Sequence, residues 1–258
     1  MRGQQEKASL FHSLHVRGSP LILCNVWDAG SAKAVAAAGA RALASSSWAV
    51  AAANGYADGE HVPAHLVFSN AARIVQATPL PVSIDIESGY GVSAEAVASS
   101  VRSLLDAGAV GCNIEDSFPE DKRLRPIEQQ VERLRAARNT ASAAGIDLFI
   151  NARTDMFFAT PAERHSRTLV AGALERARAY AAAGANGLFA PGLEDLNLIW
   201  ELCEGSPLPV NIMLGDINAS VAQLASNKVA RVSFGPAPYL FVMQTVADRA
   251  RAMFHLPT

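Results

Sequence analysis

Acidic residues at the ends of two neighbouring apolar runs are the clearest sign of chemistry in this 258-residue chain. Asp85 and Glu87 are two positions apart, so on a strand both side chains lie on the same face. Glu115 follows the next run. Three oxygen ligands without a histidine or cysteine suit Mg²⁺, or Mn²⁺, better than zinc, and a divalent cation would relieve their mutual repulsion. The alternative is that backbone amides or arginine side chains bind each carboxylate separately.

Arg153 follows another apolar run and is the natural partner of an anionic substrate. A guanidinium can bind a substrate carboxylate through two parallel hydrogen bonds. The alternative for Arg153 is a structural ion pair with Asp155 or Glu115, because charged residues also form networks that only support a fold.

Other polar residues are weaker candidates when each is taken alone. Backbone amides at Ser46, Ser47 and Trp48 could stabilise an oxyanion, although serine clusters more often form turns or helix caps. Asp58, in the loop 54–60, resembles an ordinary turn aspartate. Asn211 lies in a later apolar run.

A recurring pattern predicts the elements that position these residues. Alanine-rich helical stretches end at Gly39, Gly108 and Gly184, where glycine supplies the left-handed cap conformation, and an apolar run follows each at once. The runs are continuously apolar rather than alternating, which is typical of parallel strands buried on both faces. Helices are clearest over 94–105, 127–144 and 163–183. Eight runs are predicted strands: 21–26, 40–44, 81–86, 110–114, 147–152, 187–190, 208–213 and 229–234.

Eight such units in a chain of this length predict an α/β fold, a (β/α)8 TIM barrel, in a single domain over 1–258 with 1–19 as a helical lead-in. A doubly wound sheet would usually carry a glycine-rich phosphate motif after its first strand, and residues 25–30 lack that spacing. In a barrel, catalytic residues gather at the C-terminal ends of the strands, so the candidates above would meet at one opening.

Composition excludes several classes of partner. A net charge of −2 without a basic stretch argues against nucleic-acid binding. The longest uncharged stretches have 16 residues, whereas a membrane-spanning helix needs about 20. The chain opens without the apolar core of a signal peptide, and its three distant cysteines form no disulfide pattern. We therefore expect a cytoplasmic protein that binds a small molecule.

In their order along the chain, these motifs resemble those of the isocitrate lyase/phosphoenolpyruvate mutase superfamily over nearly the full length. The matching segments begin with 25–32 and with Ser46-Ser47-Trp48, which Gly55 and Asp58 follow. They continue with 85–91 (Asp-Ile-Glu-Ser-Gly-Tyr-Gly), 113–116 (Asn-Ile-Glu-Asp) and 152–155 (Ala-Arg-Thr-Asp). Each motif is modest by itself, and the ordered set is specific.

The resemblance implies a Mg²⁺-dependent barrel that acts on small 2-oxo or 2-hydroxy carboxylates. It places Asp85 on the metal and Glu87, Glu115 and Asp58 around the metal's waters. It also implies homodimers that exchange the last helix, about 239–254, between subunits, often paired into homotetramers. The substrate would bind Asp85 through the metal and would also contact Ser46, Ser47, Trp48, Arg153 and Asn211. We assign the catalytic roles to Asp58, Arg153 and Ser47.

Two departures from the superfamily limit the prediction of the reaction. The lid segment 117–126 contains no cysteine, whereas the lyases carry a catalytic cysteine there. After the sixth strand, residues 189–192 read Phe-Ala-Pro-Gly, where other members place a glutamate or histidine. We expect a short-chain lyase or decarboxylase that breaks a C–C bond through an enolpyruvate-like intermediate. The alternatives are a phosphonopyruvate-type P–C bond mutase or hydrolase and a non-catalytic 2-oxo-acid binding protein.

Overall fold

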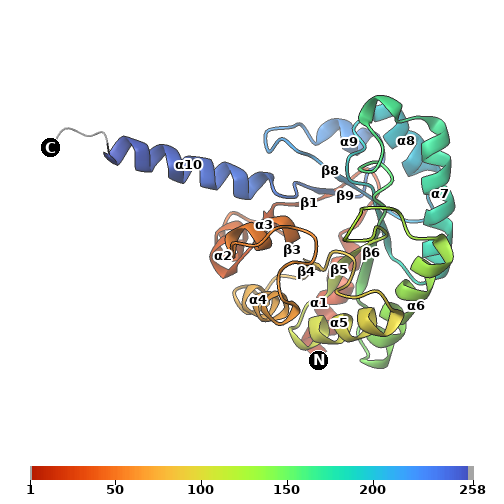
Figure 1. Cartoon of the computed structure of the whole chain (residues 1–258), viewed down its shortest axis with the longest axis horizontal. Helices are drawn as coiled ribbons and strands as arrows, with labels where there is room; N and C mark the ends of the chain where they lie inside the picture. The colour runs from red at the N-terminus through yellow and green to blue at the C-terminus, as the bar shows by residue number, and fades with distance from the viewer. Residues whose placement is uncertain (1, 255–258) are drawn as a thin grey trace.

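A ring of parallel strands forms the centre of the molecule (Figure 1). The computed structural model describes residues 2–254, and Met1 and 255–258, at the two ends of the expected domain, lie outside the described residues. The strands are β1 (Leu21–Leu23), β2 (Asn25–Val26), β3 (Leu43–Ser45), β4 (Val82–Asp85), β5 (Gly111–Glu115), β6 (Phe149–Arg153), β7 (Gly187–Phe189), β8 (Val210–Met213) and β9 (Arg231–Ser233).

The ring closes through β1 and β2, which are separated only by Cys24 and together correspond to the strand predicted over 21–26. β1 pairs with β9, with Leu21 opposite Arg231, and β2 pairs with β3, with Asn25 opposite Ala44. Every other neighbouring pair is also parallel. The eight predicted strands are therefore found in their predicted order, and the TIM-barrel fold is confirmed.

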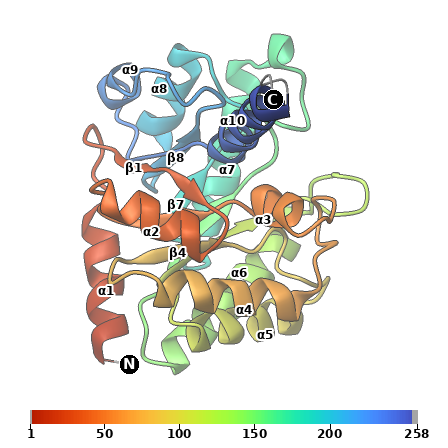
Figure 2. The same cartoon turned by 90° about the vertical axis from the view of Figure 1, so that its left-hand side faces the viewer.

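The helical elements are α1 (Arg2–Ser13), α2 (Ala29–Ala37), α3 (Ser47–Ala53), α4 (Ala64–Gln76), α5 (Ala94–Asp106), α6 (Ile127–Ala143), η1 (Ala162–Arg164), α7 (Arg167–Ala182), α8 (Leu196–Gly205), α9 (Ala222–Ser226) and α10 (Ala237–Phe254). Helices α2 and α4 to α9 surround the ring, and each packs against the next in this order (Figure 2). The segment expected as one helix over 163–183 begins instead with a short 3₁₀ turn, η1, and its α-helix starts after Ser166, whose side chain caps it.

Small side chains explain how the helices approach the strands so closely. Ala137, Ala173 and Ala177 are fully buried on α6 and α7. The low bulk of these residues lets the helix backbones lie near the barrel, which is why the chain is rich in alanine. None of the helices in residues 2–254 is long and apolar enough to cross a membrane.

Helix α1 closes the N-terminal end of the barrel. The expected helical lead-in over 1–19 is shorter in the structure, because α1 ends at Ser13 and a turn with a Val16–Ser19 bridge follows. The ring of Phe11 lies so close to Gly111 that a Cβ atom there would come within 2.9 Å of it. Phe11 also packs edge-on against Phe149, with 5.5 Å between ring centroids. Glycine at position 111 therefore makes room for the ring of Phe11, which plugs this end of the barrel.

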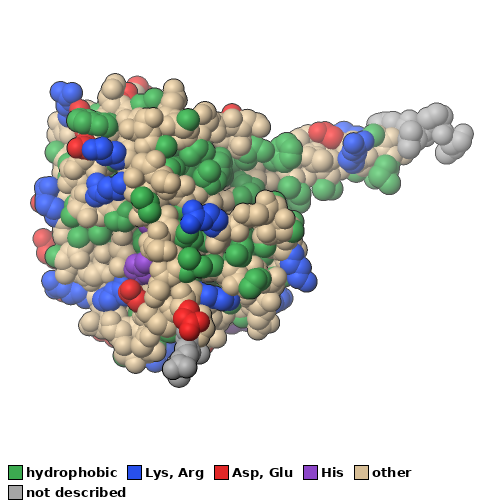
Figure 3. Space-filling view, turned by 180° about the vertical axis from the view of Figure 1, so that it is seen from behind, with side chains coloured by type: hydrophobic (Ala, Val, Ile, Leu, Met, Phe, Trp, Pro, Cys, Tyr) green, Lys and Arg blue, Asp and Glu red, His purple; other side chains and the backbone are tan. Residues whose placement is uncertain are grey.

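Helix α10 is the exception to this packing. It projects from the body of the molecule, and none of its described residues is buried (Figure 1). Hydrophobic side chains gather along it and where it leaves the body (Figure 3). The exposed apolar residues of α10 are Leu240, Phe241, Val242, Met243, Val246, Met253 and Phe254.

His15 makes the acid stability of the fold predictable. Its ring stacks on Phe149 at 3.9 Å and its Nδ1 lies 2.7 Å from the carbonyl oxygen of Phe11. Burial, and then repulsion from Arg231, lowers the pKa of His15 from 6.5 to about 3. Between these two values the unfolded chain binds a proton at His15 that the native chain does not. His15 therefore makes the free energy of unfolding fall as the pH decreases through this window.

We expect His15→Phe to reduce the slope of the free energy of unfolding against pH by up to about 1.4 kcal/mol per pH unit, which corresponds to one proton. The measurement is urea unfolding at several pH values from 4 to 7. His61→Phe is the matched control, because His61 is exposed. Equal slopes for the wild type and His15→Phe would contradict the prediction.

Candidate active site

The C-terminal ends of the strands open onto a cavity of about 160 Å³. Its lining includes the apolar side chains of Trp48, Phe158, Phe189 and Met213. Most of the residues that the sequence predicted for the site also line it: Ser46, Ser47, Trp48, Asp58, Asp85 and Arg153. Asn113 is a further lining residue. The barrel therefore gathers side chains from distant parts of the sequence, from Asn25 to Pro236, as expected for this fold.

Asp85 is held at the end of β4 by short polar contacts. The hydroxyl of Ser47 donates to Oδ2 at 3.0 Å, and the backbone amide of Glu87 donates to Oδ1 at 3.2 Å. Its own amide donates to Ser45 Oγ at 2.9 Å. Ser46 caps α3 through its side chain, which accepts from the amide of Ala49 at 3.3 Å. The side chain of Ser46 therefore serves as a helix cap, which was the alternative to a role in binding an oxyanion. The residue also lines the cavity.

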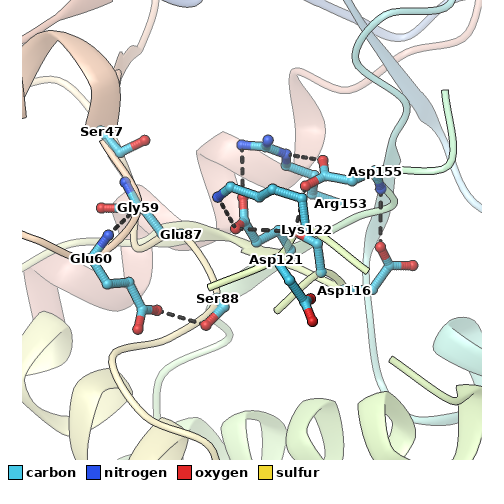
Figure 4. A network of polar contacts seen from close by, with 12 residues as sticks. Ser47, Gly59, Glu60, Glu87, Ser88, Asp116, Asp121, Lys122, Arg153 and Asp155 are labelled. Carbon is cyan, nitrogen blue, oxygen red and sulfur yellow. Dashed lines mark hydrogen bonds and ion pairs between the residues drawn. The ribbon is translucent and has the colours of Figure 1, made fainter. Parts of the chain in front are cut away.

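Glu87 fastens the loop that carries Asp58 to the barrel. Its Oε2 accepts from the backbone amides of Gly59 at 2.8 Å and Glu60 at 2.6 Å (Figure 4). Its Oε1 accepts from the Tyr90 hydroxyl at 3.1 Å. Burial, and then repulsion from Asp58 and Asp85, raises the pKa of Glu87 to about 7. Glu87 therefore acts as an anchor that is bound mainly by backbone amides.

Glu115 and Asp155 share the guanidinium of Arg153. Arg153 Nη1 lies 3.0 Å from Glu115 Oε2, and its Nε donates to Asp155 Oδ1 at 2.6 Å (Figure 4). Ser117 donates to Asp155 Oδ2 at 2.6 Å. Burial by itself lowers the pKa of Arg153, but Glu115 and Asp155 outweigh it and raise the pKa above its ordinary value. Arg153 therefore has the structural role that the sequence left as its alternative, and it also faces the cavity.

A second buried ion pair, between Asp116 and Arg176, contacts the backbone of Asp155. Asp116 accepts from the amide of Asp155 at 2.9 Å through Oδ1, and its Oδ2 lies 3.0 Å from Arg176 Nη1. The Tyr180 hydroxyl donates to the same Oδ2 at 2.7 Å. Burial raises the pKa of Asp116, and Arg176 acts against the rise. This pair fixes the loops after β5 and β6 relative to each other.

The metal site of Asp85, Glu87 and Glu115, with Asp85 on the metal and the two glutamates around its waters, stays a prediction. Among the described residues, no cluster of three or more histidine, cysteine, aspartate or glutamate side chains is arranged to hold a metal ion. Glu87 is bound by amides and Glu115 by Arg153, as the alternative to the metal site required. Asp85 and Asp58 remain at the cavity wall.

These two aspartates still fit Mg²⁺, which usually keeps several waters and binds through one or two carboxylates. Asp58 is exposed to solvent, and partial desolvation by the surrounding residues, followed by repulsion from Asp85, raises its pKa. Two neighbouring carboxylates at one wall form a hard oxygen donor set, and a cation between them would relieve their repulsion.

Asn211, which the sequence placed in the substrate-binding set, is not itself a lining residue of the cavity, but it bonds to Ser233, which is, so its role stays a prediction. It is 1% exposed, and its Oδ1 accepts from Ser233 at 3.3 Å. The position within a predicted strand could not show whether its side chain lies at the opening or deeper in the barrel.

Lys122 is a site residue that sequence reasoning missed. Lys122 follows no strand directly, but the lid segment 117–126 brings its Nζ to 3.8 Å from Glu115 Oε1 (Figure 4). A bridge between Ser117 and Leu124 folds the lid back on itself. The missed signal was the position of Lys122 within the segment already predicted as a lid.

Comparison with known proteins agrees with this geometry. The model of the phosphoenolpyruvate phosphomutase family matches residues 11–254. The chain belongs to this family. It is 52% identical to a protein of Burkholderia cenocepacia J2315 that is provisionally called a phosphonomutase, over 96% of this chain and 99% of the other, with a TM-score of 0.94.

Two further relatives come from other bacteria. An uncharacterized protein of Mycobacterium tuberculosis is 36% identical over 94% of this chain and 88% of its own. The oxaloacetate decarboxylase of Bradyrhizobium sp. (strain ORS 278) is 30% identical over 70% of this chain and 62% of its own. The superfamily consists of lyases, decarboxylases and mutases, so this chain belongs to a group of enzymes.

Arg153→Met tests the role of the shared guanidinium. Removing it leaves Glu115 and Asp155 buried without their counter-charge, and breaking a buried ion pair in this way typically costs about 3–5 kcal/mol. We expect a loss of that size in the free energy of unfolding at neutral pH, measured with urea. Adding Glu115→Gln should recover part of it.

The matched control is Arg102→Met on the exposed side of α5. We expect it to change the free energy of unfolding by less than about 0.5 kcal/mol, as surface substitutions usually do. A loss no greater than that of the control in Arg153→Met would show that the ion pairs do not stabilise the opening.

Proposed function

We propose that this protein is a Mg²⁺-dependent lyase or decarboxylase that cleaves a C–C bond in a small 2-oxo or 2-hydroxy carboxylate through an enolpyruvate-like intermediate. The observation that carries the proposal is the cavity itself, where Asp58 and Asp85 face the guanidinium of Arg153. The aspartates provide hard oxygen ligands for a cation, and Arg153 provides a donor for a carboxylate. Both are required to bind an oxo acid together with its metal.

Asp85 would hold Mg²⁺ directly, with Asp58 on its bound waters. The ion would serve as a Lewis acid for the negative charge that develops when the bond beside the carbonyl breaks. Ser47 orients Asp85 through its hydrogen bond to Oδ2. Glu87 and Glu115 support the site through the loop and the arginine that they hold.

Arg153 would bind the substrate through one edge of its guanidinium. Nε and Nη1 are occupied by Asp155 and Glu115, whereas Nη2 has no hydrogen-bond acceptor among residues 2–254. The two carboxylates prevent the guanidinium from rotating, so Nη2 is already oriented before the substrate arrives. Such preorganised donors stabilise developing charge without reorganisation, and losing one typically costs about 3 kcal/mol.

The apolar wall would limit access of water and the size of the substrate. Phe158 and Phe189 lie beneath the guanidinium, with ring centroids 5.5 Å and 5.9 Å from Arg153 Cζ. A cavity of about 160 Å³ suits a small acid. Excluding water strengthens the electrostatic contacts inside the cavity.

A phosphonopyruvate-type mutase or hydrolase is the second candidate. The relative that is 52% identical to this chain is provisionally called a phosphonomutase. The same metal and arginine would serve a P–C bond, because the oxo-carboxylate end of the substrate is shared.

The deciding experiment is an activity panel of 2-oxo and 2-hydroxy acids with Mg²⁺, including oxaloacetate, read by formation of pyruvate or glyoxylate. Phosphate or phosphoenolpyruvate from phosphonopyruvate would favour the second candidate. Tight oxalate binding without turnover of any acid would instead indicate a binding protein.

Asp85→Ala tests the metal assignment on the substrate that the panel finds. We expect loss of Mg²⁺ binding by calorimetry and a decrease in kcat/KM of at least about a hundredfold, because the carboxylate on the metal is gone. Asp106→Ala, at an exposed position of α5, is the matched control. Metal affinity and turnover that both survive in Asp85→Ala would refute the assignment.

We further propose a homodimer, or a pair of dimers, in which α10 packs on the neighbouring subunit. The exposed apolar residues of α10 favour this, because a projecting helix with such a surface is unfavourable in water. Substrate binding within each barrel is compatible with this arrangement.

Phe241→Lys should weaken the association by about 2 kcal/mol or more, roughly thirtyfold in the dissociation constant, since buried aromatic anchors dominate interfaces. Sedimentation velocity at several protein concentrations measures the change. Ser99→Lys, at an exposed position of α5, is the control. A wild-type protein that is monomeric at every concentration would rule out the dimer.

A further inference from the structure

Asn113 lies in the cavity wall, and its side chain is oriented from inside the barrel. In the strand register it stands between Asp85 of β4 and Asn151 of β6. Its Oδ1 accepts a hydrogen bond from Asn151 Nδ2 at 2.9 Å and another from Arg231 Nη2 at 3.4 Å. The amide oxygen is therefore directed away from the cavity, toward two donors in the barrel interior.

Arg231 makes this orientation difficult to reverse. It is 1% exposed, and its Nε and Nη1 have no hydrogen-bond partner among the described residues. A buried guanidinium is costly when its donors are unsatisfied, so the contact with Asn113 Oδ1 matters to it. If the amide turned over, Asn113 Nδ2 would face the donors of Arg231 and Asn151. Donor would then meet donor at both contacts.

The Nδ2 of Asn113 is consequently the atom left for the cavity. It has no acceptor among residues 2–254, although Asn113 lines the cavity beside Asp85 and Arg153. An amide donor whose orientation is fixed, next to a guanidinium donor whose orientation is fixed, is a suitable arrangement for an anionic oxygen.

We propose that Asn113 is a substrate-binding residue, whose Nδ2 donates to a carboxylate or enolate oxygen of the bound acid. Asn151 and Arg231 are positioning residues that act through Asn113 and do not touch the ligand. This inference rests on the proposed function, because it takes an oxo acid as the ligand. It adds a donor from β5 to the donor that Arg153 provides from β6.

The test measures oxalate binding by calorimetry with Mg²⁺ present. Asn113→Leu removes the donor, and Asn113→Asp keeps the shape and both interior contacts while placing an acceptor toward the cavity. We expect both variants to bind oxalate roughly ten- to hundredfold more weakly, the range for losing a hydrogen bond to a charged group. Asn113→Asp keeps the test valid if Asn113→Leu does not fold.

Ser83→Ala is the matched control. Ser83 is also buried in the barrel, its hydroxyl has no partner among the described residues, and it does not line the cavity. We expect its oxalate affinity to stay within twofold of the wild-type value. Affinities of both Asn113 variants within twofold of the wild type would overturn the proposal.

A double-mutant cycle separates positioning from general damage to the fold. Asn151→Leu should weaken oxalate binding in the wild-type background and have little further effect in the Asn113→Leu background. If Asn151 were only structural, the two losses would add, and its positioning role would be refuted.

Turnover of the acids in the activity panel tests the proposed function independently of oxalate binding. Oxalate binding that depends on Asn113, in a protein that turns over no acid of the panel, would refute the enzyme proposal and leave this inference intact. A wild-type protein that does not bind oxalate would overturn the inference.

Discussion

The opening of this barrel depends on the compensation of buried charge. Acidic side chains that follow β4, β5 and β6 converge on a small space, and carboxylates cannot stay ionised there without a partner. Arg153 pairs with both Glu115 and Asp155, Arg176 pairs with Asp116, and backbone amides of Gly59 and Glu60 bind Glu87. Once these acids are bound, Asp58 and Asp85 are the ones that remain at the cavity wall.

The compensation of buried charge also explains how loops without regular secondary structure become part of the site. The loop with Asp58 has no strand or helix of its own, yet two amides tie it to Glu87. The lid carries Lys122 to Glu115 in a similar way. Charged partners thus substitute for the apolar packing that holds the helices, and they do so where a substrate must enter.

Much of the fold could be predicted from the sequence, because continuous apolar runs and helix-ending glycines are local signals. Strand 21–26 was found as one run, although Cys24 separates it into β1 and β2. The helix expected over 163–183 was wrong at its start, since Ser166 caps a helix that a 3₁₀ turn precedes. Local patterns identify an element well and its ends less well.

The sequence predicted most of the residues that form the site, but not which of them bind one another. The motifs brought Ser47, Asp58, Asp85 and Arg153 to one cavity, as the resemblance implied. Sequence spacing could not decide whether Arg153 serves the substrate or Glu115, because that depends on distances between different strands. It also could not place Asn211 at its depth in the barrel or find Lys122, whose position depends on how the lid folds.

The plug at the base of the barrel has a consequence for the movement of molecules. Phe11 packs against Gly111, and the buried guanidinium of Arg231 lies over the ring of Phe11, so side chains among residues 2–254 fill the N-terminal end of the barrel. Substrate and products must use the same opening. A cleavage that yields two fragments would then have to release both of them past the same residues that bound the substrate.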